Sequence, residues 1–256
     1  MNESLRIAIV QQRMYWTTQE NTQFILGKIE SAARHGAQIC VFPELAVTGF
    51  HRQIRTEATP EIVAPALSDI RKACAKFRVA SLVGTPTFDT FGNIFNSAEF
   101  ITDTGETCAT IAKIGITPAE ATFFAEGAER PIVDFLGHRS TAILCREAND
   151  VELLQAQIAT NTVDIIYWPG IMRPDPEKPD NAEHHLLDAS SLAKHTGAYI
   201  IQANWPMSLN YPEESIDSGH SIVISPSGET LFRLPKAQVG MGVFTLGDTH
   251  FIWIEL

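Results

Sequence analysis

Short apolar runs alternate with amphipathic segments in the first third of the chain. Apolar residues dominate positions 5–11, 37–42 and 79–84, each a run of strand length. Between them, residues 18–34 and a segment that opens at Thr59 and Pro60 carry apolar residues at helical spacing. An order of strand, helix, strand, helix, strand is typical of parallel strands covered by helices. The pattern therefore predicts an α/β fold.

The pattern changes in the middle and at the end of the chain. Residues 93–102 and 107–112, joined by a turn at 103–106, predict an antiparallel hairpin. Beyond the hairpin the alternation of strand and helix resumes, in segments expected at 140–145, 151–160, 163–168, 182–195 and 198–203. The last part of the chain predicts a meander of strands at 219–225, 230–234, 242–246 and 251–254.

No linker, internal repeat or low-complexity tract interrupts the 256 residues, so we expect a single domain over residues 1–256. A hydrophobic content of 45% is enough for a continuous core. Three long irregular segments, 49–59, 170–180 and 204–218, are expected to line a site, because long loops in compact domains are usually functional.

The balance of acidic and basic residues bears on the class of molecule that the chain can bind. The formal net charge is -11, with 19 Lys and Arg against 30 Asp and Glu, which argues against nucleic acid and against an anionic membrane surface. No apolar stretch approaches the roughly 18 to 20 residues of a membrane helix. The four cysteines form no Cys-x-x-Cys, and the first residues enter a strand directly. These features indicate a reduced, cytoplasmic protein with a small polar substrate.

Cys145 is placed where a nucleophile is expected. It ends the apolar run Ser-Thr-Ala-Ile-Leu-Cys, and Asp150 followed by Val-Glu-Leu-Leu predicts a helix start shortly afterwards. A strand-to-helix turn exposes a side chain, and the helix N-terminus beyond it favours a thiolate. The alternative is a buried structural thiol, since unpaired cysteine is among the most buried residue types.

Two charged residues, Glu44 and Lys113, also stand where strands meet loops. Glu44 follows the second strand after a proline, and removal from water would raise its pKa toward that of a general base. Lys113 ends the hairpin, and Glu120 lies close enough in sequence to hold its ammonium toward a developing oxyanion. Singly, each has an ordinary alternative as a capping or solvated side chain. Together with Cys145 they supply a base, a cation and a nucleophile.

The segments around these residues resemble a known family. Glu44 lies in Phe-Pro-Glu-Leu-Ala-Val-Thr-Gly-Phe, Lys113 begins Lys-Ile-Gly-Ile-Thr-Pro-Ala-Glu, and Cys145 lies in Ala-Ile-Leu-Cys-Arg-Glu. With Asn96-Ser97, Tyr167 to Gly170, and Gly219-His220-Ser221, this order resembles the nitrilase superfamily of carbon-nitrogen hydrolases, nearly end to end. Two departures are Arg146, where many relatives carry an aromatic residue, and Gly115, where a histidine is frequent.

The resemblance implies a four-layer α-β-β-α sandwich that packs into homodimers or higher homo-oligomers. It implies that Glu44 deprotonates Cys145, that the thiolate attacks an amide carbonyl, and that Lys113 with the backbone N–H of Arg146 stabilises the oxyanion. Glu120 would orient the lysine. The chemistry would need no cofactor, and His184 and His185, adjacent on a predicted helix, form no metal pair.

Substrate recognition is predicted less sharply. Arg146 and Arg173 are candidates for binding a substrate carboxylate. Further candidates for substrate contact are Phe50, Phe123, Glu147, Trp168 and Met172. The leading hypothesis is an amidase for a small aliphatic, carboxylate-bearing amide. The alternatives are a nitrilase, an N-carbamoyl amide hydrolase or an acyltransferase with the same residues, and a catalytically silent relative that binds a metabolite.

Overall fold

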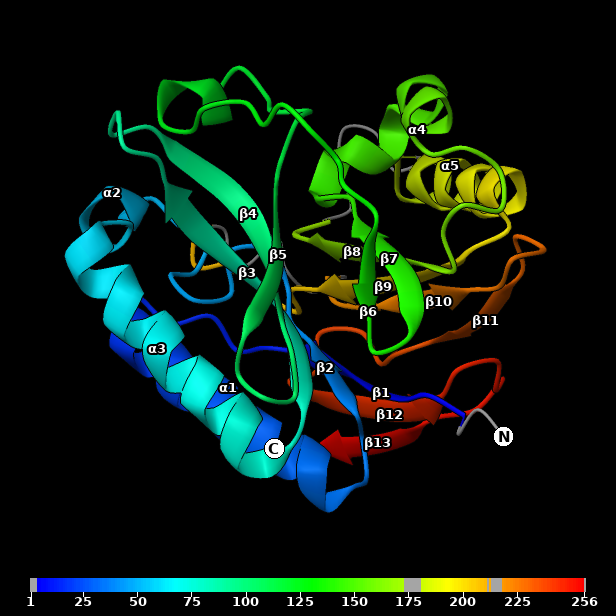
Figure 1. Cartoon of the computed structure of the whole chain (residues 1–256), viewed down its shortest axis with the longest axis horizontal. Coiled ribbons are helices and arrows are strands. Elements are labelled where there is room, and N and C mark those ends of the chain that lie inside the picture. Colours follow the sequence, from blue (N-terminus) through cyan, green and yellow to red (C-terminus); the bar gives the residue numbers. More distant parts are fainter. Residues whose placement is uncertain (1–3, 173–180, 211, 213–217, 256) are drawn as a thin grey trace.

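Two β-sheets form the centre of the molecule (Figure 1). The computed structural model describes residues 4–172, 181–210, 212 and 218–255. Within these residues, sheet A has seven strands, in the order β13 (Ile252–Glu255), β12 (Gly240–Thr245), β1 (Arg6–Gln11), β2 (Ile39–Val41), β3 (Ala80–Phe88), β4 (Ile94–Ile101) and β5 (Thr107–Ala112). Sheet B has six described strands, in the order β11 (Thr230–Arg233), β10 (Ile222–Ile224), β9 (Tyr199–Asn204), β8 (Ile165–Gly170), β7 (His138–Ala142) and β6 (Val133–Phe135).

Helices cover the outer face of each sheet. The helices α1 (Thr18–Arg34) and α3 (Pro60–Phe77) pack against sheet A in one apolar cluster. This cluster includes Val10 and Phe42. The helices α4 (Val151–Gln157) and α5 (Asn181–Thr196) pack on sheet B through Leu154 and Leu192. The layers therefore run helix, sheet, sheet, helix, and the predicted α-β-β-α sandwich is confirmed.

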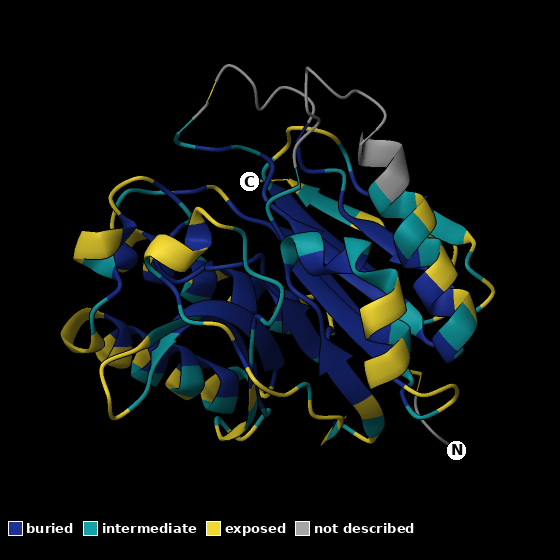
Figure 2. Cartoon of the chain, turned by 90° about the horizontal axis from the view of Figure 1, so that it is seen from above, coloured by how far each residue is buried: buried dark blue, intermediate teal, exposed yellow. Residues whose placement is uncertain are grey.

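Apolar side chains fill the space between the two sheets, where Figure 2 shows the strands as the buried centre of the molecule. Phe100 of sheet A meets Phe135 and Tyr167 of sheet B, with ring centroids 5.1 and 5.9 Å apart in edge-to-face geometry. Such pairs add to the free energy gained by burying apolar area. The two sheets are therefore joined by one continuous core.

Local signals explain where the long helices begin and end. The hydroxyl of Thr17 accepts the N–H of Glu20 and donates to its carboxylate, which satisfies a free donor at the start of α1. Pro60 occupies the first turn of α3, and Arg78, with φ of 55°, ends that helix. No helix in the described part of the chain is long and apolar enough to cross a membrane.

The structure differs from the predicted elements in three respects. The expected C-terminal meander is wrong: β10 and β11 extend sheet B, whereas β12 and β13 join sheet A beside β1. Those segments do form strands as predicted, but the strand with which each one pairs depends on the sheet edge that lies nearby in the folded chain. In addition, the predicted loop 49–59 contains the short helix α2 (Ile54–Glu57), and β6 forms a hairpin with β7.

Parallel strands in both sheets direct chemically important residues to strand ends. β1, β2 and β3 are parallel in sheet A, and β7, β8 and β9 are parallel in sheet B. Glu44 follows β2 and Cys145 follows β7. Both residues therefore lie beyond the carboxyl ends of strands, where α/β sheets commonly place their sites.

Gly84 of β3 lets this strand pass close to the segment that carries Glu44. A Cβ atom on Gly84 would lie 2.2 Å from the carbonyl oxygen of Pro43 and 2.4 Å from the nitrogen of Leu45. The amide N–H of Val47 donates to the carbonyl of Gly84, 3.1 Å away, which fixes the approach. Both clashing atoms belong to the backbone, so no side-chain rotation would relieve the contact.

We expect Gly84→Ala to destabilise the protein by about 1–3 kcal/mol or more, because overpacking against backbone forces a shift of the chain. Gly27→Ala is the matched control. Gly27 lies within α1 with nothing near its added Cβ, so this change should raise the free energy of unfolding by about 0.5–1 kcal/mol. Urea unfolding of both variants measures the difference. Equal stability of the two would contradict the close approach.

Candidate active site

A lysine ammonium is buried between two carboxylates. Lys113, directly after β5, donates to Oε1 of Glu44 at 2.8 Å and to Oε1 of Glu120 at 2.6 Å. Glu120 begins the short 3₁₀ helix η1 (Glu120–Thr122), and its other oxygen accepts the N–H of Thr117. All three charged side chains are buried. The two carboxylates hold the pKa of Lys113 above its ordinary value, so the ammonium stays charged.

Glu44 combines a fixed backbone with one free carboxylate oxygen. The indole N–H of Trp205 donates to the Glu44 carbonyl at 2.8 Å. Oε1 of Glu44 accepts from Lys113 and from the side-chain amide of Asn96. Oε2 is buried and has no hydrogen-bond partner among the described residues. Burial raises the pKa of Glu44 above the ordinary range, which makes it a stronger base.

Cys145 occupies a strained turn at the end of a strand. It begins the 3₁₀ helix η2 (Cys145–Asn149) with φ of 50°, in the left-handed region that β-carbon-bearing residues rarely adopt. The indole N–H of Trp168 donates to the carbonyl oxygen of Cys145 at 2.8 Å and so holds this conformation. Burial and the charge of Glu44 raise the pKa of Cys145 to about 12. The resting residue is therefore a thiol.

Glu147 links the turn that contains Cys145 to the residues that follow Lys113. Its carboxylate accepts the N–H groups of Leu144, Ile114 and Gly115 and pairs with Arg130 at 2.8 Å. These bonds lower the pKa of Glu147 despite the cost of burial. Contrary to the prediction that Glu147 contacts substrate, its carboxylate is used inside the protein. It holds the strand end before Cys145 against the two residues after Lys113.

Arg146 is anchored on the protein surface rather than left free. Its guanidinium donates to the carbonyl of Gly115 at 3.2 Å and to Asp150 at 3.0 Å. A Cβ at Gly115 would lie 2.7 Å from the Asp150 carboxylate and 3.4 Å from the Arg146 guanidinium. The absence of a side chain at Gly115 therefore makes room for the Asp150 carboxylate that pairs with Arg146, which links the two departures noted in the sequence.

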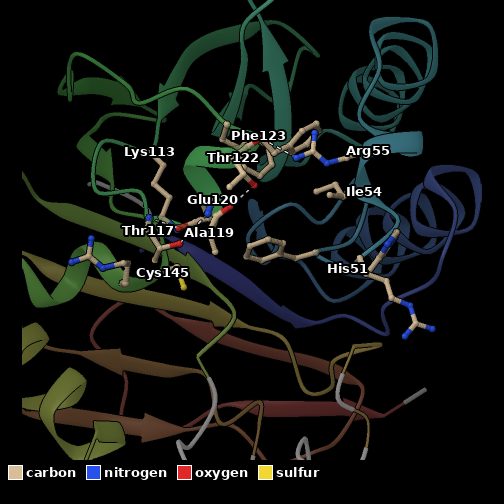
Figure 3. A pocket seen from close by; sticks show the side chains of 14 residues that line it. His51, Ile54, Arg55, Lys113, Thr117, Ala119, Glu120, Thr122, Phe123 and Cys145 are labelled. Atoms are coloured by element: carbon tan, nitrogen blue, oxygen red, sulfur yellow. Dashed lines mark hydrogen bonds and ion pairs between the residues drawn. The ribbon is translucent and has the colours of Figure 1, made fainter.

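A cavity of about 330 Å³ opens over Cys145 and Lys113 (Figure 3). The predicted contact residues Phe50 and Phe123 line it, as does Arg146. Trp168 does not line the cavity, because it is buried beneath Cys145 with its indole turned to the cysteine carbonyl. Met172 also stands outside the lining, although its sulfur lies 3.7 Å from that of Cys145. Arg173 lies outside the described residues.

Other lining residues were missed by inspection of the sequence. Arg55 and Ile54 line the cavity from α2, within the irregular segment 49–59 that was expected to border a site. His51 of the same segment also lines the cavity, as its place in that loop predicts, and burial lowers its pKa. For Arg55 and Ile54 the one signal was loop length. Within the described residues, no group of three or more His, Cys, Asp and Glu is arranged to hold a metal ion.

Comparison with solved structures finds amidases with a similar fold. An amidase from Nesterenkonia sp. superposes with a TM-score of 0.82 at 22% identity, over 97% of this chain and 92% of that one. A variant of this amidase in complex with butyramide gives a TM-score of 0.80 at 22% identity, over 95% and 91% of the two chains. Another variant, with acrylamide added at the active-site cysteine, gives 0.81 at 23% identity, over 96% and 94%.

Sequence comparison agrees with the structural one. The chain is 22% identical over 212 residues to a protein named probable nitrilase from Schizosaccharomyces pombe, covering 81% of this chain and 75% of that one. It is 20% identical over 225 residues to a glutamine-dependent NAD(+) synthetase from Acinetobacter baylyi, covering 84% of this chain but 39% of that relative's length. A family model described as carbon-nitrogen hydrolase matches residues 6–246. The chain therefore belongs to the carbon-nitrogen hydrolase family.

Proposed function

We propose that this chain is an amidase that hydrolyses a small aliphatic amide to a carboxylate and ammonia through a thioester on Cys145. The observation that carries the proposal is the buried Oε2 of Glu44, which has no hydrogen-bond partner among the described residues although its twin oxygen is held by Lys113. A free lone pair on a raised-pKa carboxylate can accept the thiol proton. The amidase seen with butyramide supports a small amide as the substrate.

In the first half of the reaction Glu44 takes the proton from the thiol of Cys145, and the sulfur attacks the amide carbonyl carbon. The carbonyl oxygen becomes an oxyanion, which the ammonium of Lys113 and the backbone N–H of Arg146 stabilise. Glu44 then gives its proton to the amide nitrogen, the carbon–nitrogen bond breaks, and ammonia leaves. Protonation is necessary because an amide nitrogen is a poor leaving group.

In the second half a water molecule attacks the carbonyl carbon of the thioester. Glu44 accepts a proton from this water, and the carbon–sulfur bond breaks to release the acid, which ionises. The proton passes from Glu44 back to the sulfur of Cys145. Throughout both halves Glu120 holds the ammonium of Lys113 by a hydrogen bond, so that the lysine faces the carbonyl oxygen of the substrate.

Nitrile hydrolysis, N-carbamoyl hydrolysis and acyl transfer to an amine would use the same thioester, and mass spectrometry of the products distinguishes them. A silent, metabolite-binding relative would release no product at all.

The homodimer expected from the resemblance stays a prediction. Leu153 of α4 and Leu187 of α5, which are exposed on the outer face of sheet B, are the apolar side chains that such a contact would cover.

Cys145→Ala should abolish ammonia release from a panel of small amides, with a loss of about a thousandfold or more, because the nucleophile is removed. Cys108→Ala is the matched control, since Cys108 is an exposed thiol on β5 outside the cavity. Both variants should unfold at the urea concentration of the unmodified chain. Turnover retained by Cys145→Ala would contradict the proposed mechanism.

The activity should fall on the acid side with an apparent pKa above the ordinary range of glutamate. Glu44 acts as the base only when deprotonated, and burial raises its pKa, so protonation removes the base at a higher pH than for an exposed glutamate. The raised pKa of Lys113 keeps its charge at neutral and mildly alkaline pH. The measurement is kcat/KM against pH, with unfolding followed at each pH as a control. An acid limb at or below pH 4 would contradict this role.

Trp168→Phe should lower kcat by about tenfold or more with little change in KM, because the strained turn of Cys145 loses its hydrogen bond from the indole. Trp253→Phe is the matched control. The indole N–H of Trp253 is buried without a hydrogen-bond partner among the described residues, and this residue lies far from the cavity on β13. Steady-state kinetics on one neutral amide compare the variants. Equal effects of the two would show that Trp168 contributes packing alone.

A further inference from the structure

Arg55 and Phe123 form a pair at the side of the cavity away from Cys145 (Figure 3). The guanidinium carbon of Arg55 lies 4.8 Å from the centroid of the Phe123 ring, and one of its nitrogens donates to the carbonyl of Thr122 at 2.8 Å. Phe123 is itself held edge-to-face against Phe124, with centroids 4.7 Å apart. The guanidinium is thus positioned by two contacts, while most of its five N–H groups remain free of them.

Three arginines line this cavity, and they differ in what neutralises their charge. Arg146 is paired with Asp150. Arg52 and Arg55 have no carboxylate within ion-pair distance among the described residues. Arg52 lies over the ring of Trp16, 5.3 Å from its centroid. Arg55 is therefore the arginine that is fixed beside Phe123 and has no carboxylate partner among the described residues.

The acidic side chains near Arg55 are already used elsewhere. The carboxylate of Glu57, two residues along α2, accepts the backbone N–H of Thr18 at 2.6 Å. Glu120, the acidic residue in the cavity lining, pairs with Lys113. In a chain of formal net charge -11, an unpaired guanidinium in the wall of a cavity creates a local preference for an anion. A planar guanidinium suits a carboxylate because it can donate two parallel hydrogen bonds.

The cavity between these ends is apolar. Phe50, Ile54 and Phe124 line it together with the Phe123 ring. An amide that reaches Cys145 from this cavity therefore places its acyl chain against aromatic and aliphatic side chains and its far end near Arg55. Methylene groups match such a wall, and a charged group is matched only at the guanidinium.

We propose that Arg55 is the specificity-determining residue of this site, and that it binds a carboxylate at the far end of the substrate. This inference rests on the proposed amidase function and narrows its substrate class to amides whose aliphatic acyl chain ends in an anion. Arg55 binds the substrate but takes no part in bond breaking.

The test compares two amides that differ at the far end of the chain, pentanamide and glutaramate, the monoamide of glutaric acid. We expect the unmodified chain to prefer glutaramate. Arg55→Gln should lower kcat/KM for glutaramate by about tenfold or more and leave the value for pentanamide within about twofold, because one charged hydrogen-bonding partner is lost. Arg55→Lys should retain part of the preference, since the charge remains without the planar fork.

Arg34→Gln is the matched control for net charge, since Arg34 is an exposed residue of α1 outside this cavity. It should change neither substrate. Equal losses on both substrates with Arg55→Gln, or no loss on either, would overturn the role of Arg55 while amide hydrolysis by the unmodified chain upheld the proposed function. If the unmodified chain hydrolysed neither these nor other small amides, the proposed function would fail and this inference with it.

Discussion

The ammonium of Lys113, buried between Glu44 and Glu120, is the interaction on which the site depends. Removing ions from water costs several kcal/mol each, and mutual attraction repays this cost only when geometry and hydrogen bonding are good. Here one cation faces two carboxylates, so the cluster keeps an excess negative charge. Complete burial raises the pKa of Glu44; the charge of Lys113 opposes this rise, and the charge of Glu120 adds to it. Burial of the whole cluster is therefore what makes Glu44 suited to the proposed role of base.

Such a cluster needs a scaffold that excludes water and fixes each backbone. Both sheets contribute. Trp205, which follows β9 of sheet B, holds the carbonyl of Glu44, which follows β2 of sheet A. Trp168 of β8 holds the carbonyl of Cys145, and Glu147 joins the cysteine turn to the loop after Lys113. Buried hydrogen bonds from these side chains position the groups of the proposed reaction, and the core between the sheets fixes the side chains in turn.

Much of the fold could be predicted from the sequence because its signals are local. The apolar periodicity of α1 and α3, the proline at the start of α3 and the strand-length runs of β1, β8 and β9 all specify their elements within a few residues. The placement of the last four strands could not be predicted. β10 and β12 are both short runs buried at nearly every position, so nothing local distinguishes them, and the sheet that each joins is decided by contacts with distant strands.

The candidate site shows the same contrast between what local sequence signals specify and what distant contacts decide. The sequence by itself determined which residues are chemically able to react, since a thiol, a carboxylate and a lysine at strand ends, set in the quoted segments, single out Cys145, Glu44 and Lys113. The tertiary structure alone decided how their neighbours act. In the folded chain, Glu147 and Trp168 do not line the cavity, and their side chains hydrogen-bond to the backbone instead. Arg55 of the short helix α2 lies in the cavity wall. Orientation depends on packing between segments far apart in the chain, and no local pattern encodes that packing.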